Sequence, residues 1–190
     1  MEQKRSSRLI LKTSDLTIDS TTNKGTCDTY RTTFTWANVN LRALLGDLYD
    51  EYDYFNLYLN TIATSQANAA VNAGNDNDRL IYIKMSGLPF VNQSFQPSAG
   101  SNGVHTYIDV YQIPMTAVTW FQLYCDPSNV QTFSKYQDLC NITITLSRVV
   151  DDVKPNLTAA FPQFTFIFTI IGVNRSSNPD KIDHLMKSLR

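Results

Sequence analysis

The ten residues FTFIFTIIGV, at positions 164–173, are aromatic, β-branched or otherwise apolar on both faces of an extended chain. Aromatic and β-branched side chains favour strands. A strand that is apolar on both faces is typical of the centre of a sheet that is covered on both sides. We therefore expect residues 164–173 to form a central strand that is buried from both sides.

Alternation of apolar and polar residues predicts further strands along most of the chain. In residues 30–36, for example, Phe34 and Trp36 share one face and Thr33 and Thr35 share the other. The remaining strand candidates are residues 9–11, 16–18, 55–60, 79–85, 104–111, 118–124 and 142–147.

The connections between these eight or nine candidate strands differ greatly in length. Regular short hairpins are typical of an up-and-down barrel, whereas long crossing loops are typical of a Greek-key sandwich or a jelly roll. We therefore predict an all-β fold, a single jelly-roll sandwich of about eight strands spanning residues 13–178.

Two segments have helical rather than strand periodicity. Leucines and tyrosines of residues 41–52 recur on one helical face, Asn40 is a suitable N-cap, and Asp47, Asp50, Glu51 and Asp53 occupy the solvated surface. The pattern of residues 179–190 predicts a second amphipathic helix, which either packs on its own sheet or docks on a neighbouring protein. Its apolar stripe consists of Ile182, Leu185, Met186 and Leu189.

Residues 1–12 form a basic N-terminal arm. Lys4, Arg5, Arg8 and Lys12 are opposed by one glutamate. Such an arm is either a solvated terminus or a tether to an anionic surface or an acidic groove. Lys4, Arg5 and Arg8, with the apolar stripe of residues 179–190, are the candidate partner contacts. If they act in docking, deleting residues 1–8 or 179–190 should leave the domain folded but prevent its incorporation into an assembly.

Composition excludes several classes of function. The chain has 190 residues, 17% of them charged, with a net charge of −1. A sequence-specific nucleic-acid binder needs a basic surplus, and a membrane span needs roughly 18 consecutive apolar residues; the sequence has neither. The N-terminus lacks the pattern of a signal peptide. Together with the odd number of cysteines (Cys27, Cys125 and Cys140), this predicts reduced thiols in a cytosolic compartment.

The sequence offers no catalytic, metal or cofactor motif. His105 and Asp109 are separated by four strand residues, about 13 Å, which is too far for a hydrogen bond. His184 lies among charged residues of the terminal helix, where a solvated position is expected. Zinc-ligand spacings, nucleotide-binding glycine patterns and nucleophile elbows are all missing. We therefore expect no enzyme activity, no metal and no cofactor.

Two stretches resemble small capsid proteins of large icosahedral nucleocytoplasmic DNA viruses, the chlorella-virus type in particular. They are TWANVNLRALLGDLYDEY (35–52), which runs into FNLYLN (55–60), and IKMSGLPF (83–90). The resemblance implies a single jelly roll, since the chain is too short for the double jelly roll of the major capsid proteins. It implies a minor capsid or penton protein of the virion, made in the host cytoplasm. Its partners would be the major capsid protein, other capsid proteins and copies of itself.

The composition agrees with a subunit of an assembly, because charge-poor and aromatic-rich surfaces suit lasting protein contacts. Two other classes remain open. A cytosolic jelly-roll carbohydrate-binding module would need exposed aromatic platforms, for which Tyr107 and Tyr111 beside His105 are candidates. An enzyme of unrecognised type would need a pocket with convergent titratable groups.

Overall fold

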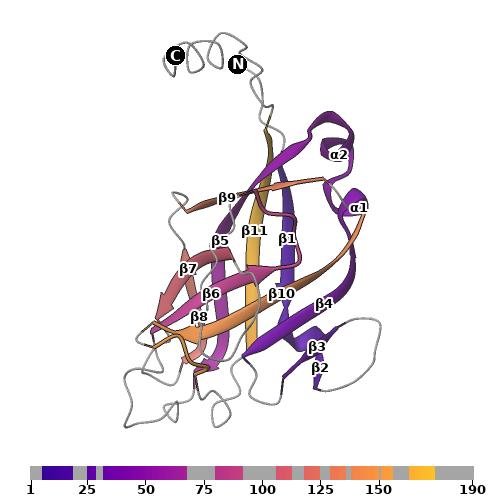
Figure 1. Ribbon diagram of the computed structural model, residues 1–190. Helices are drawn as coiled ribbons and strands as arrows, with labels where there is room; N and C mark the ends of the chain where they lie inside the picture. The colour runs from indigo at the N-terminus through magenta and orange to yellow at the C-terminus, as the bar shows by residue number, and fades with distance from the viewer. Residues whose placement is uncertain are drawn as a thin grey trace, which may run out of the picture.

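The structure is a computed structural model, which describes two facing sheets and a short helical insertion (Figure 1). The residues described are 6–18, 25–28, 32–67, 80–91, 106–112, 118–124, 129–135, 138–149, 151–155 and 163–173. The predicted helix of residues 179–190 lies outside these ranges, as do Lys4, Arg5, His105, Cys125 and His184.

Within the described residues, eleven strands make up the two sheets, and the predicted all-β sandwich is confirmed. The five-stranded sheet has the order β1-β11-β5-β8, with β9 also paired to β5. Its strands are β1 (Ser6–Lys12), β5 (Tyr54–Ala67), β8 (Val118–Tyr124), β9 (Val130–Ser134) and β11 (Gln163–Val173).

The six-stranded sheet has the order β2-β3-β4-β10-β6-β7. Its strands are β2 (Thr17–Ile18), β3 (Thr26–Cys27), β4 (Thr33–Asn40), β6 (Leu80–Ser86), β7 (Thr106–Gln112) and β10 (Leu139–Arg148). A 3-10 turn, η1 (Thr13–Asp15), connects β1 to β2 and thereby links the two sheets.

The strand pairs are nested within one another along the chain. The first strand, β1, pairs with the last, β11; β4 pairs with β10, β5 with β8 and β9, and β6 with β7. All of these pairs are antiparallel, and the short pair β2–β3 is parallel. These antiparallel pairs thus enclose one another in chain order, and the further antiparallel pairs β5–β11 and β6–β10 join them into the two sheets.

The core lies between the sheets, where inward-facing side chains meet. In β11, Phe164, Phe166, Phe168 and Ile170 are almost fully buried, and the Phe164 ring lies 6.0 Å from that of Phe34 in the opposite sheet. The alternate residues of β11 are only half-buried. β11 is central in its sheet, as expected, but the expectation of burial from both sides was wrong, because only one face of the sheet is covered by the other.

Irregularities in three strands change which residues face the core. In the pairing of β5 with β11, Asn60 is an extra residue, so the inward positions shift from Leu59 to Ile62. In β4, Asn38 adopts a φ of 55° and its N–H donates to Asn141 Oδ1 at 2.9 Å. In β7, Ile108 is an extra residue opposite β6.

The predicted helix of residues 41–52 is two short helices, α1 (Leu41–Leu45) and α2 (Asp47–Glu51). They are separated by Gly46, whose φ of 55° and ψ of −131° interrupt the helix. Asn40 is the N-cap, as predicted, and its side chain accepts a hydrogen bond from Ala43 N at 2.9 Å. The apolar stripe survives the break, because Leu41, Leu45 and Leu48 are all buried.

Candidate interaction surfaces

The insertion α1–α2 forms one end of the sandwich and is held there by contacts with distant segments (Figure 1). Leu41 N donates to Asp138 O at 2.8 Å, which ties α1 to the start of β10. The Ser7 hydroxyl donates to Leu44 O at 2.7 Å, which ties α1 to β1. The insertion is therefore positioned by a backbone acceptor just before β10 and by a side-chain donor on β1, one for each sheet.

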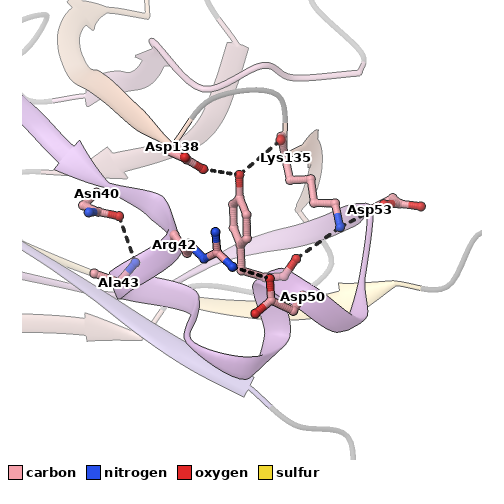
Figure 2. Close-up of polar contacts among 8 residues, drawn as sticks. Asn40, Arg42, Ala43, Asp50, Asp53, Lys135 and Asp138 are labelled. Atoms are coloured by element: carbon pink, nitrogen blue, oxygen red, sulfur yellow. Dashed lines mark hydrogen bonds and ion pairs between the residues drawn. The ribbon is translucent and has the colours of Figure 1, made fainter.

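Tyr49 of α2 is the centre of a polar network at this end, drawn in Figure 2. Its hydroxyl donates to Asp138 Oδ1 at 2.6 Å, and the Arg42 guanidinium and Lys135 ammonium lie 5.7 Å and 5.8 Å from its ring centroid. The hydrogen bond to Asp138 raises the pKa of Tyr49, with smaller contributions from burial and from the negative charge of Asp138. The ring is thus fixed between two cations and a carboxylate.

Two ion pairs complete this surface: Arg42 with Asp50 at 3.0 Å and Lys135 with Asp53 at 3.1 Å (Figure 2). The four predicted carboxylates are exposed, as expected. Exposed pairs contribute little to stability, about 0–1 kcal/mol.

The basic arm continues into the sheet. Residues 6–12 form β1, in which Leu9 and Leu11 face the core while Arg8, Ile10 and Lys12 are exposed. Within the described residues, β1 pairs on one side only, so it is an edge strand with backbone groups open to a partner. Arg8 is the one predicted basic contact that the structure places.

Both ends of the described chain lie at the insertion end of the sandwich. Ser6, the first described residue, pairs with Ile171, and Val173, the last, pairs with Tyr54, the first residue of β5, which only Tyr52 and Asp53 separate from α2. The remaining predicted contacts lie outside the described residues, namely Lys4, Arg5, Ile182, Leu185, Met186 and Leu189. The two segments that carry them are attached to neighbouring strands.

A second surface is a cleft of about 410 Å³ between β7 and β9, at the open side of the sandwich. Its polar and aromatic lining comes from Tyr82, Tyr107, Asp109, Asn129 and Gln131. Sequence reasoning singled out Tyr107 but missed the rest, because they come from three strands and no local pattern links them.

The prediction that Tyr107 and Tyr111 share an exposed face was wrong. Tyr107 lines the cleft, whereas Tyr111 is fully buried in the core. The cause is the extra residue Ile108, which reverses the alternation between the two tyrosines.

The described cysteines are structural in character. Cys27 and Cys140 are both buried. Burial raises the pKa of the Cys140 thiol to about 11, and a protonated thiol is a poor nucleophile. Within the described residues there is no group of three or more His, Cys, Asp or Glu side chains placed to hold a metal ion. Nor does any helix there have the length and apolarity that crossing a bilayer requires.

Comparison with known proteins gives weak structural similarities, two of which are to viral proteins. A crystal structure of mavirus penton protein matches with a TM-score of 0.33 and 10% identity, over 50% of this chain and 33% of that chain. A virus-like particle of the extra small virus of the giant freshwater prawn Macrobrachium rosenbergii matches with a TM-score of 0.25 and 11% identity, over 92% of this chain and 83% of that one. No protein-family model matches the sequence, and neither does any curated protein.

Proposed function

We propose that this chain is a single jelly roll that serves as a non-enzymatic structural subunit of an icosahedral virus capsid, as a minor capsid or penton protein. The observation that carries the proposal is the nesting of the strand pairs. A jelly roll arises when a long antiparallel hairpin rolls up, so that its first strand pairs with its last and each inner pair follows in turn. The pairs β1–β11, β4–β10, β5–β8 and β6–β7 follow that order.

The sequence resemblance to capsid proteins of the chlorella-virus type supports the same function. Residues 35–60 cover most of β4, both helices and the first half of β5, and residues 83–90 cover the end of β6 and the turn after it. The residues that carry the resemblance therefore include surface residues of the insertion end, with Tyr49 among them, as well as core residues. We infer that this end meets other capsid proteins.

The described surfaces suit a subunit with several neighbours. β1 offers an unpaired edge, and its exposed Ile10 adds an apolar contact beside Arg8. The proposed partners are the major capsid protein, other minor capsid proteins and further copies of this chain. The proposed location is the virion, after synthesis in the host cytoplasm.

Cryo-electron microscopy of purified particles with five-fold averaging tests this proposal. Five copies of the sandwich at each vertex would identify a penton protein with head-to-tail contacts. Density beneath the capsomers would identify a minor capsid protein. Absence of the chain from purified particles would refute the capsid function in both forms.

The two terminal segments should be required for incorporation but not for folding. Because Ser6, Ser7 and Arg8 belong to β1, deleting residues 1–8 would also damage the sheet. The cleaner deletions are residues 1–5 and 179–190, and we expect each to leave thermal unfolding unchanged while the chain is lost from particles, as measured by quantitative mass spectrometry.

Point variants distinguish the loss of apolar side-chain contacts from the shortening of the chain. Leu185→Asp should reduce incorporation as the deletion does, whereas Lys187→Gln, outside the predicted apolar stripe, should not. Normal incorporation of both deletions would rule out a docking function for these segments.

A further inference from the structure

The cleft between β7 and β9 is shaped by the irregular pairing of β7. The extra residue Ile108 interrupts the ladder to β6, and the carboxylate of the next residue, Asp109, comes within hydrogen-bond distance of Asn129, the residue before β9. Two side-chain bonds bridge the sheets here: Gln131 Nε2 donates to Tyr107 O at 2.9 Å, and Asn129 Nδ2 donates to Asp109 Oδ1 at 3.2 Å. The volume of about 410 Å³ is in the range of small-ligand sites.

The aromatic wall of the cleft is rigidly held. The rings of Tyr82 and Tyr107 meet edge to face, with centroids 5.2 Å apart and planes at 77°. Lys84 Nζ lies 5.0 Å from the Tyr107 ring centroid and is paired with Asp152. The charge of Lys84 is thereby compensated, so it does not make the cleft an anion site. Both tyrosines line the cleft, and a tyrosine ring that is not covered by a cation has an apolar face with negative potential, which suits the C–H groups of a sugar ring.

The polar side of the cleft offers donors as well as acceptors. Among the described residues, Asp109 accepts two hydrogen bonds, one from Val110 N at 2.8 Å and one from Asn129. The acceptor atom in both is Oδ1. Within the same residues, Asn129 and Gln131 each use one of the two N–H groups of a carboxamide. Asp109 Oδ2, two amide oxygens and two amide N–H groups are left for a ligand. A cation would need acceptors only, whereas a sugar hydroxyl both donates and accepts.

We propose that this cleft binds one neutral pyranose residue of a glycan, which packs against Tyr82 and Tyr107 and hydrogen-bonds to Asp109, Asn129 and Gln131. The Asp109 carboxylate disfavours anionic sugars, since it would be brought close to their charge. This proposal does not rest on the capsid function, and the binding would hold for a subunit of a particle or for a separate protein.

Saturation-transfer NMR on the full chain tests it, with methyl α-mannoside, methyl β-galactoside, N-acetylglucosamine and 3′-sialyllactose as probes at millimolar concentrations. We expect transfer to the ring protons of at least one neutral sugar. Asn129→Ala, an exposed position, and Tyr82→Ala should each weaken that binding about tenfold or more. Tyr54→Ala, at the other end of the pair β5–β9, is the matched control and should bind as the unmodified chain does.

Several results would overturn the assignment. One is saturation transfer to sialyllactose alone. Another is binding by the Asn129 and Tyr82 variants that equals binding by the unmodified chain. The third is no transfer to any sugar. Binding of an oligolysine peptide in place of the sugars would identify an acidic docking site for a cationic partner. Circular dichroism of each variant separates loss of the site from loss of the fold, and Asn129→Ala carries the conclusion if Tyr82→Ala does not fold.

Discussion

Replacing Lys84 by alanine is expected to lower the free energy of unfolding by about 3–5 kcal/mol. Lys84 lies on the opposite face of β6 from the core residues Ile83 and Met85, yet its side chain is only 5% exposed. Its ammonium pairs with Asp152 Oδ1, and the same oxygen accepts a hydrogen bond from Ser147 at 2.5 Å. Removing the cation leaves a largely buried carboxylate whose Oδ2 has no hydrogen-bond partner among the described residues.

A second variant separates the ion pair from the packing of the lysine stem. Lys84→Met with Asp152→Asn keeps the volume, removes both charges and suits the φ of 59° at residue 152, which asparagine tolerates. We expect this double variant to recover more than half of the loss caused by Lys84→Ala, as measured by urea unfolding. A loss below about 1 kcal/mol for Lys84→Ala itself would mean that water replaces the ammonium at Asp152.

Replacing Gly87 by alanine is expected to cost about 3 kcal/mol or more in unfolding free energy. Gly87 directly follows β6 and has a φ of 94°. A Cβ at this position would lie 1.8 Å from the backbone oxygen of Asn141, in the neighbouring strand β10. A backbone oxygen inside a sheet cannot move without breaking the hydrogen bonds between strands. The cost of the steric overlap therefore adds to the cost of the backbone strain.

Gly46 is the matched control for Gly87. It too has a positive φ, 55°, but a Cβ there meets no atom within 4 Å. Gly46→Ala should therefore cost the backbone strain alone, about 1–3 kcal/mol, and less than Gly87→Ala. Equal losses for the two variants, measured by thermal unfolding, would show that β10 moves away from the added methyl group and that the overlap has little effect.

The strands were largely predictable because period-two alternation is a local property. β4, β6, β7, β8, β10 and β11 each overlap a predicted range. The two missed strands lack that pattern: β3 has only two residues, and Gln131 and Thr132 interrupt the apolar character of β9. Helical periodicity likewise predicted the buried leucines of residues 41–48, but the break at Gly46 depends on a backbone conformation that a hydrophobic pattern does not record.

The surfaces were much less predictable than the strands. An inserted residue in one strand, Ile108, reverses every side chain after it, and nothing in the sequence around it marks the insertion. The cleft combines Tyr82 with Asn129 and Gln131, which are brought together only by the closing of one sheet on the other. The Tyr49 network is similar, since its partners Lys135 and Asp138 are far from α2 in the sequence.

The pairing of the first strand with the last also constrains how the protein is made. β1 is synthesised before every other described strand, and its partner β11 is synthesised after all of them. Until β11 is synthesised, Leu9 and Leu11 have no neighbouring strand, and the corresponding edge of β5 is uncovered. Folds dominated by such distant contacts form slowly, and their strand edges stay exposed until the partner strands pair. Nascent chains that stop before residue 163 should consequently be clients of chaperones or proteases, and only chains that include β11 can close the sandwich.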